Sequence, residues 1–139
     1  MPGPVDYVFG AAMLIHRRVF ESVGLFDERY FMYTEEVDLC HRLAQAGWDL
    51  YWIPLSQVTH LGEASSRQAY NAMYVQLYRS KVQFYRKFGG EPRARLFKCL
   101  VTTAYFPRLM VARIASLMKP AFAARTATIT QLLTELPRM

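Results

Sequence analysis

The chain has 139 residues, with 53% hydrophobic, 14% aromatic and 20% charged side chains. This length fits one compact domain, and this much apolar surface excludes intrinsic disorder. The net charge is +6 and the basic residues lie mostly after Arg67, which favours an anionic partner such as lipid headgroups, nucleic acid or a phosphorylated substrate.

The first elements expected are a strand and a short helix. Residues 7–15 form a nearly continuous apolar run rich in small side chains, which predicts a buried strand. Gly10 in this run allows another group to approach the backbone closely. Residues 17–23 predict a helix that ends at Gly24, because glycine tolerates the left-handed conformation that often follows a helix.

A helix and two short strands are expected next. Thr34 is the expected N-cap of a helix over residues 35–46, which has a narrow apolar face. Residues 48–53 predict a short strand, and residues 57–60 predict a second strand or an extended segment. This order of elements predicts an α/β domain.

A long helix follows in the sequence pattern. It is expected from Ser66 to about Phe88, with Gly89 and Gly90 as its stop. Four aromatic residues at helical spacing predict one packing face of this helix. They are Tyr70, Tyr74, Tyr78 and Tyr85.

The last part of the chain is basic and mixed in character. Residues 93–118, interrupted by Pro107, predict an amphipathic pair of helices suited to a membrane surface. The end, 121–139, is rich in Ala and Thr and is expected to be loosely held. We therefore expect two parts, residues 1–92 and a helical tail over 93–139.

The cysteines and the amino-terminal sequence indicate in which cellular compartment the protein is expected. Cys40 and Cys99 have neither disulfide-framework nor metal-site spacing, which favours a reducing compartment. The amino terminus lacks a basic-then-apolar signal pattern, and no clean run of about 18 apolar residues indicates an ordinary spanning helix. We expect a cytoplasmic protein, or one that is peripheral on the inner face of the cell membrane.

Three segments follow one another in a recognisable order. The first is GAAMLIHRRVF at 10–20, followed by VGLFDE; the second is FMYTEEVDLCHR at 31–42, followed by AGW; the third is VTHLG at 58–62, followed by two serines. Together, over residues 6–90, they resemble the second half of bacterial family 2 glycosyltransferases, particularly the rhamnosyltransferase-like branch.

The resemblance implies a partial GT-A fold, with a short mixed sheet flanked by helices. It implies transfer of a sugar from a nucleotide-sugar to a saccharide or lipid-linked acceptor in cell-surface polysaccharide synthesis, with Mn²⁺ or Mg²⁺ and inversion at the anomeric carbon. The Asp-x-Asp motif and the Gly-rich phosphate loop expected for donor binding are absent from the sequence. We therefore expect a truncated, acceptor-side part that is inactive by itself and lacks an amino-terminal half.

An acidic cluster carries the chemistry in this resemblance. An inverting transfer needs a base that takes the proton of the acceptor hydroxyl as it attacks, and the family's usual base corresponds to Glu36, where the family more often has Asp. Glu35 and Asp38, about 60° apart on a helix, are expected to orient the acceptor or Glu36. As an alternative, acids in a first turn simply favour the helix dipole, and Asp38 with Arg42 is an ordinary i,i+4 pair.

Other candidate residues accompany this cluster. In the family a histidine in the neighbourhood of His60 completes the metal or diphosphate site, and imidazole suits Mn²⁺; the alternative is a polar residue that ends a strand. Gly10 and Ala11 either let a sugar lie against the backbone or allow close strand–helix packing. Tyr33 and Trp48 either stack on a sugar face or belong to a core.

Three functions remain open at this point. The first is the acceptor-side half of a glycosyltransferase, which is active only in a complete site with a nucleotide-sugar and its acceptor. The second is a non-catalytic remnant or binding module. The third is a membrane-surface interaction protein that uses the basic segment 93–119. None of the three involves nucleic acid.

Overall fold

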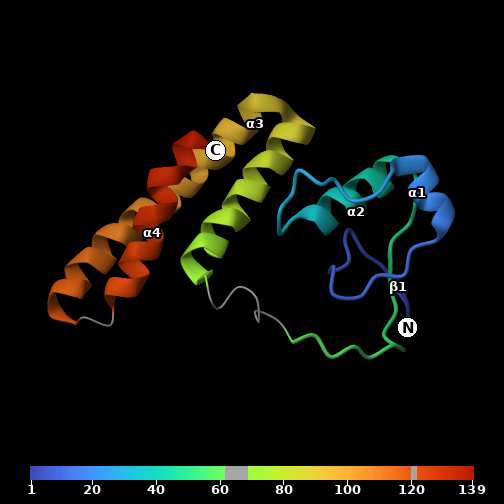
Figure 1. The fold of residues 1–139 in the computed structure, drawn as a ribbon, viewed down its shortest axis with the longest axis horizontal. Helices are drawn as coiled ribbons and strands as arrows, with labels where there is room; N and C mark the ends of the chain where they lie inside the picture. The colour runs from blue at the N-terminus through green and yellow to red at the C-terminus, as the bar shows by residue number, and fades with distance from the viewer. Residues whose placement is uncertain (62–68, 120–121) are drawn as a thin grey trace. The chain divides into compact units, whose positions relative to one another are not determined.

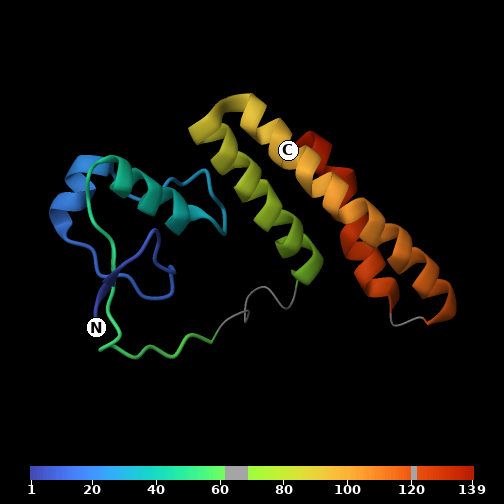
Figure 2. The ribbon, with the colours of Figure 1, turned by 180° about the vertical axis from the view of Figure 1, so that it is seen from behind.

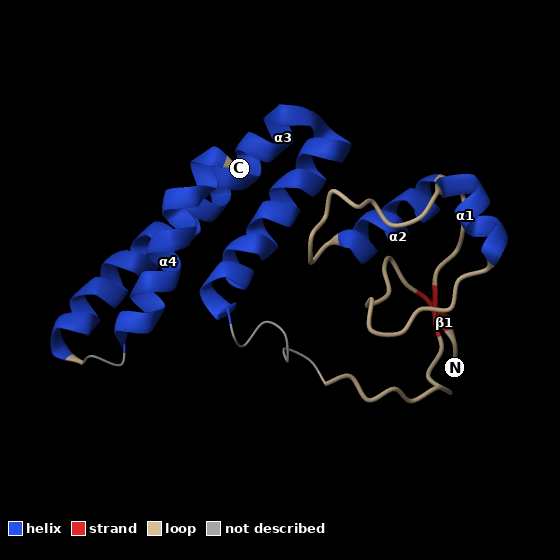
Figure 3. Cartoon of the chain, in the orientation of Figure 1, coloured by secondary structure: helices blue, strands red, loops and turns tan. Residues whose placement is uncertain are grey.

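The computed structural model describes residues 1–61, 69–119 and 122–139 (Figure 1). The chain divides into two compact units, Met1–Ala64 and Ser65–Met139, each with its own hydrophobic core. Helices predominate, and the strands of the described residues form one short pair (Figure 3). Within the same ranges, no helix combines the length and the apolar character needed to cross a membrane.

Two helices build the core of the first unit. α1 (Arg17–Val23) ends as predicted, because Gly24 adopts a φ of 76° and its N–H bonds the carbonyl of Phe20. α2 (Glu35–Gln45) matches the predicted helix to within one residue. Their apolar faces meet, and the side chains that pack there are Val19, Leu39 and Leu43, joined by Met13, Ile15, Phe20, Val23 and Leu50.

The sheet of this unit is smaller than expected. β1 (Gly3–Pro4) pairs with β2 (Tyr51–Trp52) in an antiparallel register, and residues 57–60 form no strand. Both aromatic side chains of β2 are exposed, so this pair has no buried face on which a larger sheet could be built. Among residues 1–61 the first unit is therefore a helical pair with a two-stranded ribbon, and not the expected mixed sheet.

The predicted buried strand over residues 7–15 is wrong. These residues form a loop in which Leu14 is 99% exposed, whereas Met13 and Ile15 are half-buried against α1 and α2. The apolar run therefore reflects one-sided contact with the helices rather than a place in a sheet. A strand needs a neighbouring strand for its backbone hydrogen bonds, and the short ribbon of β1 and β2 does not extend to this loop.

The second unit is built on one long, bent helix. α3 (Tyr70–Met118) changes direction at Gly90, which has a non-helical φ of 69° and ψ of −177°. The helix thus has a first arm over 70–89 and a second arm over 91–118 (Figures 1 and 2). The predicted stop at the glycine pair is confirmed by this bend, while the predicted start at Ser66 lies outside the described residues.

The end of the chain packs closely against α3, so the expectation of a loosely held tail is wrong. α4 (Ala123–Glu135) runs back along the second arm of α3 and leads into the short helix η3 (Leu136–Arg138) (Figure 2). Leu132 and Leu136 are fully buried, because each meets apolar side chains of α3. The buried cluster that they complete contains Val75, Val82, Ala94 and Val101.

The second arm of α3 continues through Pro107, so the predicted interruption there is also wrong. Proline removes one backbone donor from a helix, but packing on both sides of it holds the arm in place. Leu109 is buried, and the Tyr105 side chain packs on the core and forms hydroxyl hydrogen bonds of 2.5 Å with Tyr74 and 2.7 Å with Tyr78. Tyr74 and Tyr78 thus form a packing face that joins the two arms, and Tyr85 stacks on Phe97 of the second arm. Tyr70, which was predicted to share this face, is 59% exposed. The division expected after residue 92 falls inside this helix.

Candidate functional site

The two glutamates predicted at the site begin α2. Glu35 and Glu36 are its first residues, and both side chains are half-buried. The two residues before them, Tyr33 and Thr34, have φ angles of 68° and 72°, in the left-handed region that costs a non-glycine residue about 1–2 kcal/mol. Such strain persists only where the surrounding structure holds it in place. The sharp turn at these two residues therefore fixes where the acidic pair emerges.

Thr34 occupies the predicted N-cap position without acting as a side-chain cap. Its hydroxyl makes no capping hydrogen bond, because an N-cap side chain reaches the helix from extended backbone and not from the left-handed region. The backbone carbonyl of Thr34 still accepts a 2.8 Å hydrogen bond from the N–H of Asp38. The main chain alone thus forms the hydrogen bond that begins the helix. The side chains of Glu35 and Glu36 lie at this amino-terminal end of α2.

Asp38 is fully buried in a polar network that ties α2 to the loop after α1. Its carboxylate accepts hydrogen bonds from the Tyr30 hydroxyl at 3.2 Å and from Arg42 Nε at 2.8 Å. Arg42 also donates to the carbonyls of Val23 and Leu25. Burial, followed by the nearby Asp38 charge, raises the pKa of Tyr30 far above its ordinary value. The predicted Asp38–Arg42 pair is confirmed, and its burial favours a role in holding the turn.

Glu36 lies under the loop that carries Gly10. A Cβ at position 10 would be 3.5 Å from the Cβ of Glu36 and 3.9 Å from its carboxyl carbon. One carboxylate oxygen of Glu36, and one of Glu35, is shielded from solvent without a hydrogen-bond partner among the described residues. Burial raises the pKa of Glu36, and the charge of Glu35 raises it further, although backbone N–H groups of the helix terminus act in the opposite direction.

The same loop contacts the next turn of α2. The backbone N–H of Val8 approaches the Cys40 thiol, whose pKa is raised mainly by burial. Cys40 lies four residues after Glu36 and therefore on the same helix face. The loop thus covers one face of the first two turns of α2, with Gly10 over the carboxylate.

His60 lies beside this loop. Its ring packs edge-on against Phe9, with ring centroids 5.9 Å apart, and the side chain is exposed. No group of three His, Cys, Asp or Glu side chains that could hold a metal ion occurs in the ranges that the structure describes. The serines that follow His60 in the third segment lie outside the described residues.

Of the remaining predicted residues, Ala11 and Tyr33 lie near the glutamates and Trp48 does not. Ala11 is exposed in the loop next to Gly10, and Tyr33 is half-buried in the strained turn beside the glutamates. Trp48 follows the opposite end of α2, where its indole N–H donates to Ser22 Oγ at 3.0 Å. The eleven residues of α2 span roughly 16 Å, so the structure does not bring Trp48 to the glutamates.

Sequence reasoning missed two contributors to the site. Tyr30 anchors Asp38 from eight residues away, and Phe9 joins His60 to the loop over Glu36. Phe9 could have been found from the sequence, because it directly precedes Gly10, which was itself a predicted site residue. The reach of Tyr30 depends on the left-handed turn at residues 33 and 34, for which no sequence pattern was evident.

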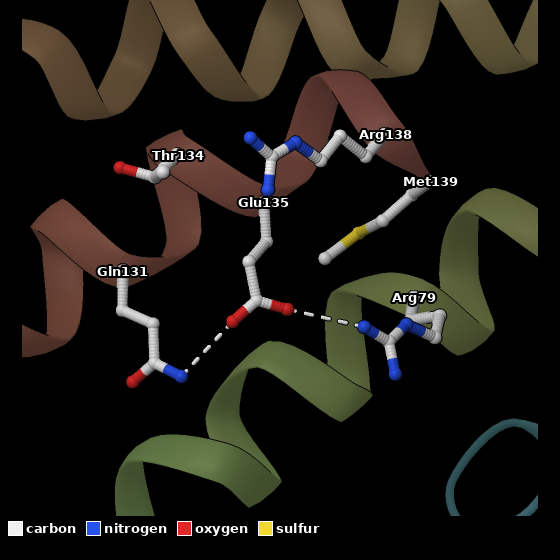
Figure 4. Close-up of a pocket in the computed structure, with 6 residues that line it drawn as sticks. All are labelled: Arg79, Gln131, Thr134, Glu135, Arg138 and Met139. Carbon is white, nitrogen blue, oxygen red and sulfur yellow. Dashed lines mark hydrogen bonds and ion pairs between the residues drawn. The ribbon is translucent and has the colours of Figure 1, made fainter.

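The second unit contains a cavity that is separate from these residues. It has a volume of about 550 Å³ and lies between the first arm of α3 and the end of α4 (Figure 4). Glu135 accepts hydrogen bonds there from Arg79 at 3.1 Å and from Gln131 at 3.0 Å. None of the site residues predicted from the sequence lines it.

The sequence of the chain matches a known protein family. The family described as Glycosyl transferase family group 2 matches residues 1–137. No solved structure matches the chain significantly.

Three curated relatives are similar over shorter stretches. N-acetylglucosaminyl-diphospho-decaprenol L-rhamnosyltransferase of Mycobacterium tuberculosis is 49% identical over 57 residues, which are 41% of this chain and 19% of the relative. Rhamnosyltransferase WbbL of Escherichia coli is 36% identical over 70 residues, 50% of this chain and 26% of the relative. Low-salt glycan biosynthesis hexosyltransferase Agl10 of Haloferax volcanii is 46% identical over 39 residues, 28% of this chain and 13% of the relative. The matched part thus spans about a quarter or less of each relative's length.

Proposed function

Since the chain belongs to family group 2 of the glycosyl transferases, we propose that it supplies the acceptor and catalytic-base side of a sugar-transfer site. In this proposal the complete enzyme has a GT-A arrangement, and its nucleotide-sugar donor is bound mainly by residues beyond those described above. The observation that carries the proposal is the half-buried Glu36 at the amino-terminal end of α2, with Gly10 over its carboxylate and a raised pKa.

The proposed reaction is an inverting transfer. The acceptor hydroxyl oxygen forms a bond to the anomeric carbon of the donor, while the bond from that carbon to the nucleotide diphosphate breaks and its electron pair leaves with the diphosphate. The acceptor proton passes to the carboxylate of Glu36. A general base works best when its pKa lies near the working pH, so burial of Glu36 suits this role. The step that we assign to the described residues is this proton transfer.

The neighbours of Glu36 have supporting roles in the proposal. After burial, the nearby Glu35 is a further cause that raises the pKa of Glu36. Asp38 is a positioning residue, because Tyr30 and Arg42 hold it inside the protein and away from an acceptor. Gly10 and Ala11 leave the approach to the carboxylate free of large side chains.

The acceptor class follows from the relatives. One of them is named for a diphospho-decaprenol acceptor, and another for glycan biosynthesis. We therefore propose a lipid-linked saccharide as acceptor and a peripheral position on the inner face of the cell membrane for the complete enzyme.

The test is a hybrid enzyme. The matching segment of the Mycobacterium tuberculosis relative is replaced by the corresponding residues of this chain, and transfer is measured with N-acetylglucosaminyl-diphospho-decaprenol and a rhamnosyl nucleotide. We expect an active hybrid in which Glu36→Gln lowers kcat at least about 100-fold, whereas Glu35→Gln, the matched control, lowers it less than about tenfold. Near-normal turnover of the Glu36→Gln hybrid would rule out the base role. A hybrid that folds but does not turn over would favour a non-catalytic binding module.

A further inference from the structure

The second arm of α3 has an apolar face that points away from the core of its unit. A helix on a protein surface normally shows polar residues at the centre of its exposed face. Here Leu96, Leu100, Val111 and Ile114 are 59%, 60%, 68% and 64% exposed. Their spacing places them on one side of the helix, together with Pro107, while Ala94, Val101, Leu109 and Ala112 face inward and are buried. We call the four exposed residues the outer stripe.

The outer stripe runs along most of the second arm in two apolar halves, with the exposed Thr103 and Pro107 between them on the same side. From Leu96 to Ile114 it extends for roughly 27 Å along the helix axis. Leu117, which is 87% exposed, continues the apolar surface towards the end of the arm. An exposed apolar stripe of this length on one helix marks an interaction surface.

The charges around the outer stripe have one sign. Arg95 and Arg113 each precede a residue of the stripe by one position and therefore project roughly 100° to one side, while Arg108 projects to the other side. All three are exposed. Between Glu91 and Glu135 the sequence contains no Asp or Glu. A partner that fits this surface is apolar in the middle and anionic at its borders.

We propose that the outer stripe docks on an anionic lipid bilayer, with the second arm of α3 parallel to the membrane plane. The leucine, valine and isoleucine side chains enter the boundary between headgroups and acyl chains, and the flanking arginines reach the lipid phosphates. This surface deepens the peripheral placement in the proposed function by naming the face that meets the membrane. Its test is nevertheless independent of sugar transfer.

The charge pattern favours lipid over a second copy of the chain. In a symmetric pair of outer stripes, the arginines at the borders of one copy would face those of the other, which disfavours association. Lipid phosphates complement the same arginines on both sides of the stripe. A bilayer also accepts a flat stripe without a matching groove.

The test measures binding of the full chain to vesicles of phosphatidylcholine with and without about 30% phosphatidylglycerol. We expect binding only with the anionic lipid, and weaker binding at high salt because salt screens the arginines. Arg95→Gln with Arg113→Gln should weaken binding about 25-fold, from about fivefold for each cationic residue at the surface. The matched control is Arg17→Gln with Arg18→Gln on α1. It has the same net charge as the Arg95→Gln, Arg113→Gln variant and should weaken binding less than about threefold.

A second pair of variants tests the apolar part. Leu100→Ser with Ile114→Ser should weaken binding at least about tenfold, while Leu25→Ser with Leu55→Ser, also exposed leucines, should leave it nearly unchanged. Equal effects of the stripe and control variants, or no binding at low salt, would overturn the proposal. If the parent chain self-associates and does not bind vesicles, and if Leu100→Ser with Ile114→Ser abolishes this self-association, the partner of the outer stripe is a second copy of the chain and not a bilayer. Glu36→Gln should bind vesicles like the parent chain, so failure of the base role is distinguished from failure of this surface.

Discussion

Gly10 lies beside Glu36 in the fold although 26 positions separate the two residues in the sequence. A Cβ at position 10 would lie 3.5 Å from the Cβ, 3.7 Å from the Cγ and 3.9 Å from the carboxyl carbon of Glu36. These are ordinary van der Waals distances, so the loop has room for one methyl group, and a larger side chain would bring further atoms close to Glu36. The size of residue 10 therefore controls how the carboxylate is covered.

Substitution of Gly10 separates folding from the position of the base. Gly10→Ala should change the free energy of unfolding by less than about 0.5 kcal/mol, while Gly10→Val should displace the carboxylate and lower kcat of the hybrid at least about tenfold. Urea denaturation and steady-state kinetics measure the two effects. Gly3→Ala is the control, because no atom lies within 4 Å of a Cβ at that position. Equal kcat for Gly10→Val and the parent would show that the closeness of residue 10 to Glu36 has no part in transfer.

Glu36 should make the stability of the chain depend on pH. Burial raises its pKa above the ordinary value of 4.5, so the folded state holds the proton more tightly than the unfolded state does. Its contribution to stability is therefore fully present below about pH 4.5 and is lost as the pH rises through the raised pKa of the folded state. Glu36→Gln removes the cost of a buried charge and should be more stable than the parent at pH 7.

Urea denaturation at pH 4 and pH 7 measures this difference. The gain from Glu36→Gln should vanish at pH 4, where Glu36 is largely protonated in both states. Glu28→Gln, a change at an exposed position in the same unit, keeps Glu36 and should follow the parent chain at both pH values. A Glu36→Gln variant that is less stable than the parent at pH 7 would contradict a raised pKa of Glu36 in the folded state.

The sequence predicted those elements that local chemistry determines. Gly24 and Gly90 mark a helix end and a helix bend because both need a positive φ, which glycine adopts readily. The acidic residues at the start of α2 were found because their motif is compact in sequence. Each of these features depends on residues within one or two helical turns.

The features that the sequence did not predict depend on distant partners. Residues 7–15 have the composition of a strand, but whether a strand forms depends on a neighbouring strand. Leu132 is buried because α4 returns along α3, which the Ala- and Thr-rich composition of the tail does not indicate. Likewise, the position of Gly10 beside Glu36 and the bond from Tyr30 to Asp38 follow from how the loops close.

Arg42 should be important for the stability of the first unit. It faces the fully buried Asp38 and also donates to the backbone carbonyls of Val23, the last residue of α1, and Leu25. Arg42→Ala removes the cation from a buried pair and should cost about 3 kcal/mol of unfolding free energy. Arg42→Lys should cost less, because the charge remains while the planar set of donors is lost. Urea denaturation followed by circular dichroism measures both, and a loss below about 0.5 kcal/mol for Arg42→Ala would contradict the network.

Leu132 tests whether α4 is an integral part of the second unit. Its side chain is fully buried in the cluster that joins α4 to both arms of α3, so Leu132→Ala should leave a cavity and cost about 3 kcal/mol. Thr134→Ala, at an exposed position on the same helix, should cost less than about 0.5 kcal/mol. Denaturation gives the free energies, and limited proteolysis should cut Leu132→Ala earlier than Thr134→Ala within residues 122–139. If both variants unfold and are cut like the parent chain, α4 does not depend on this contact.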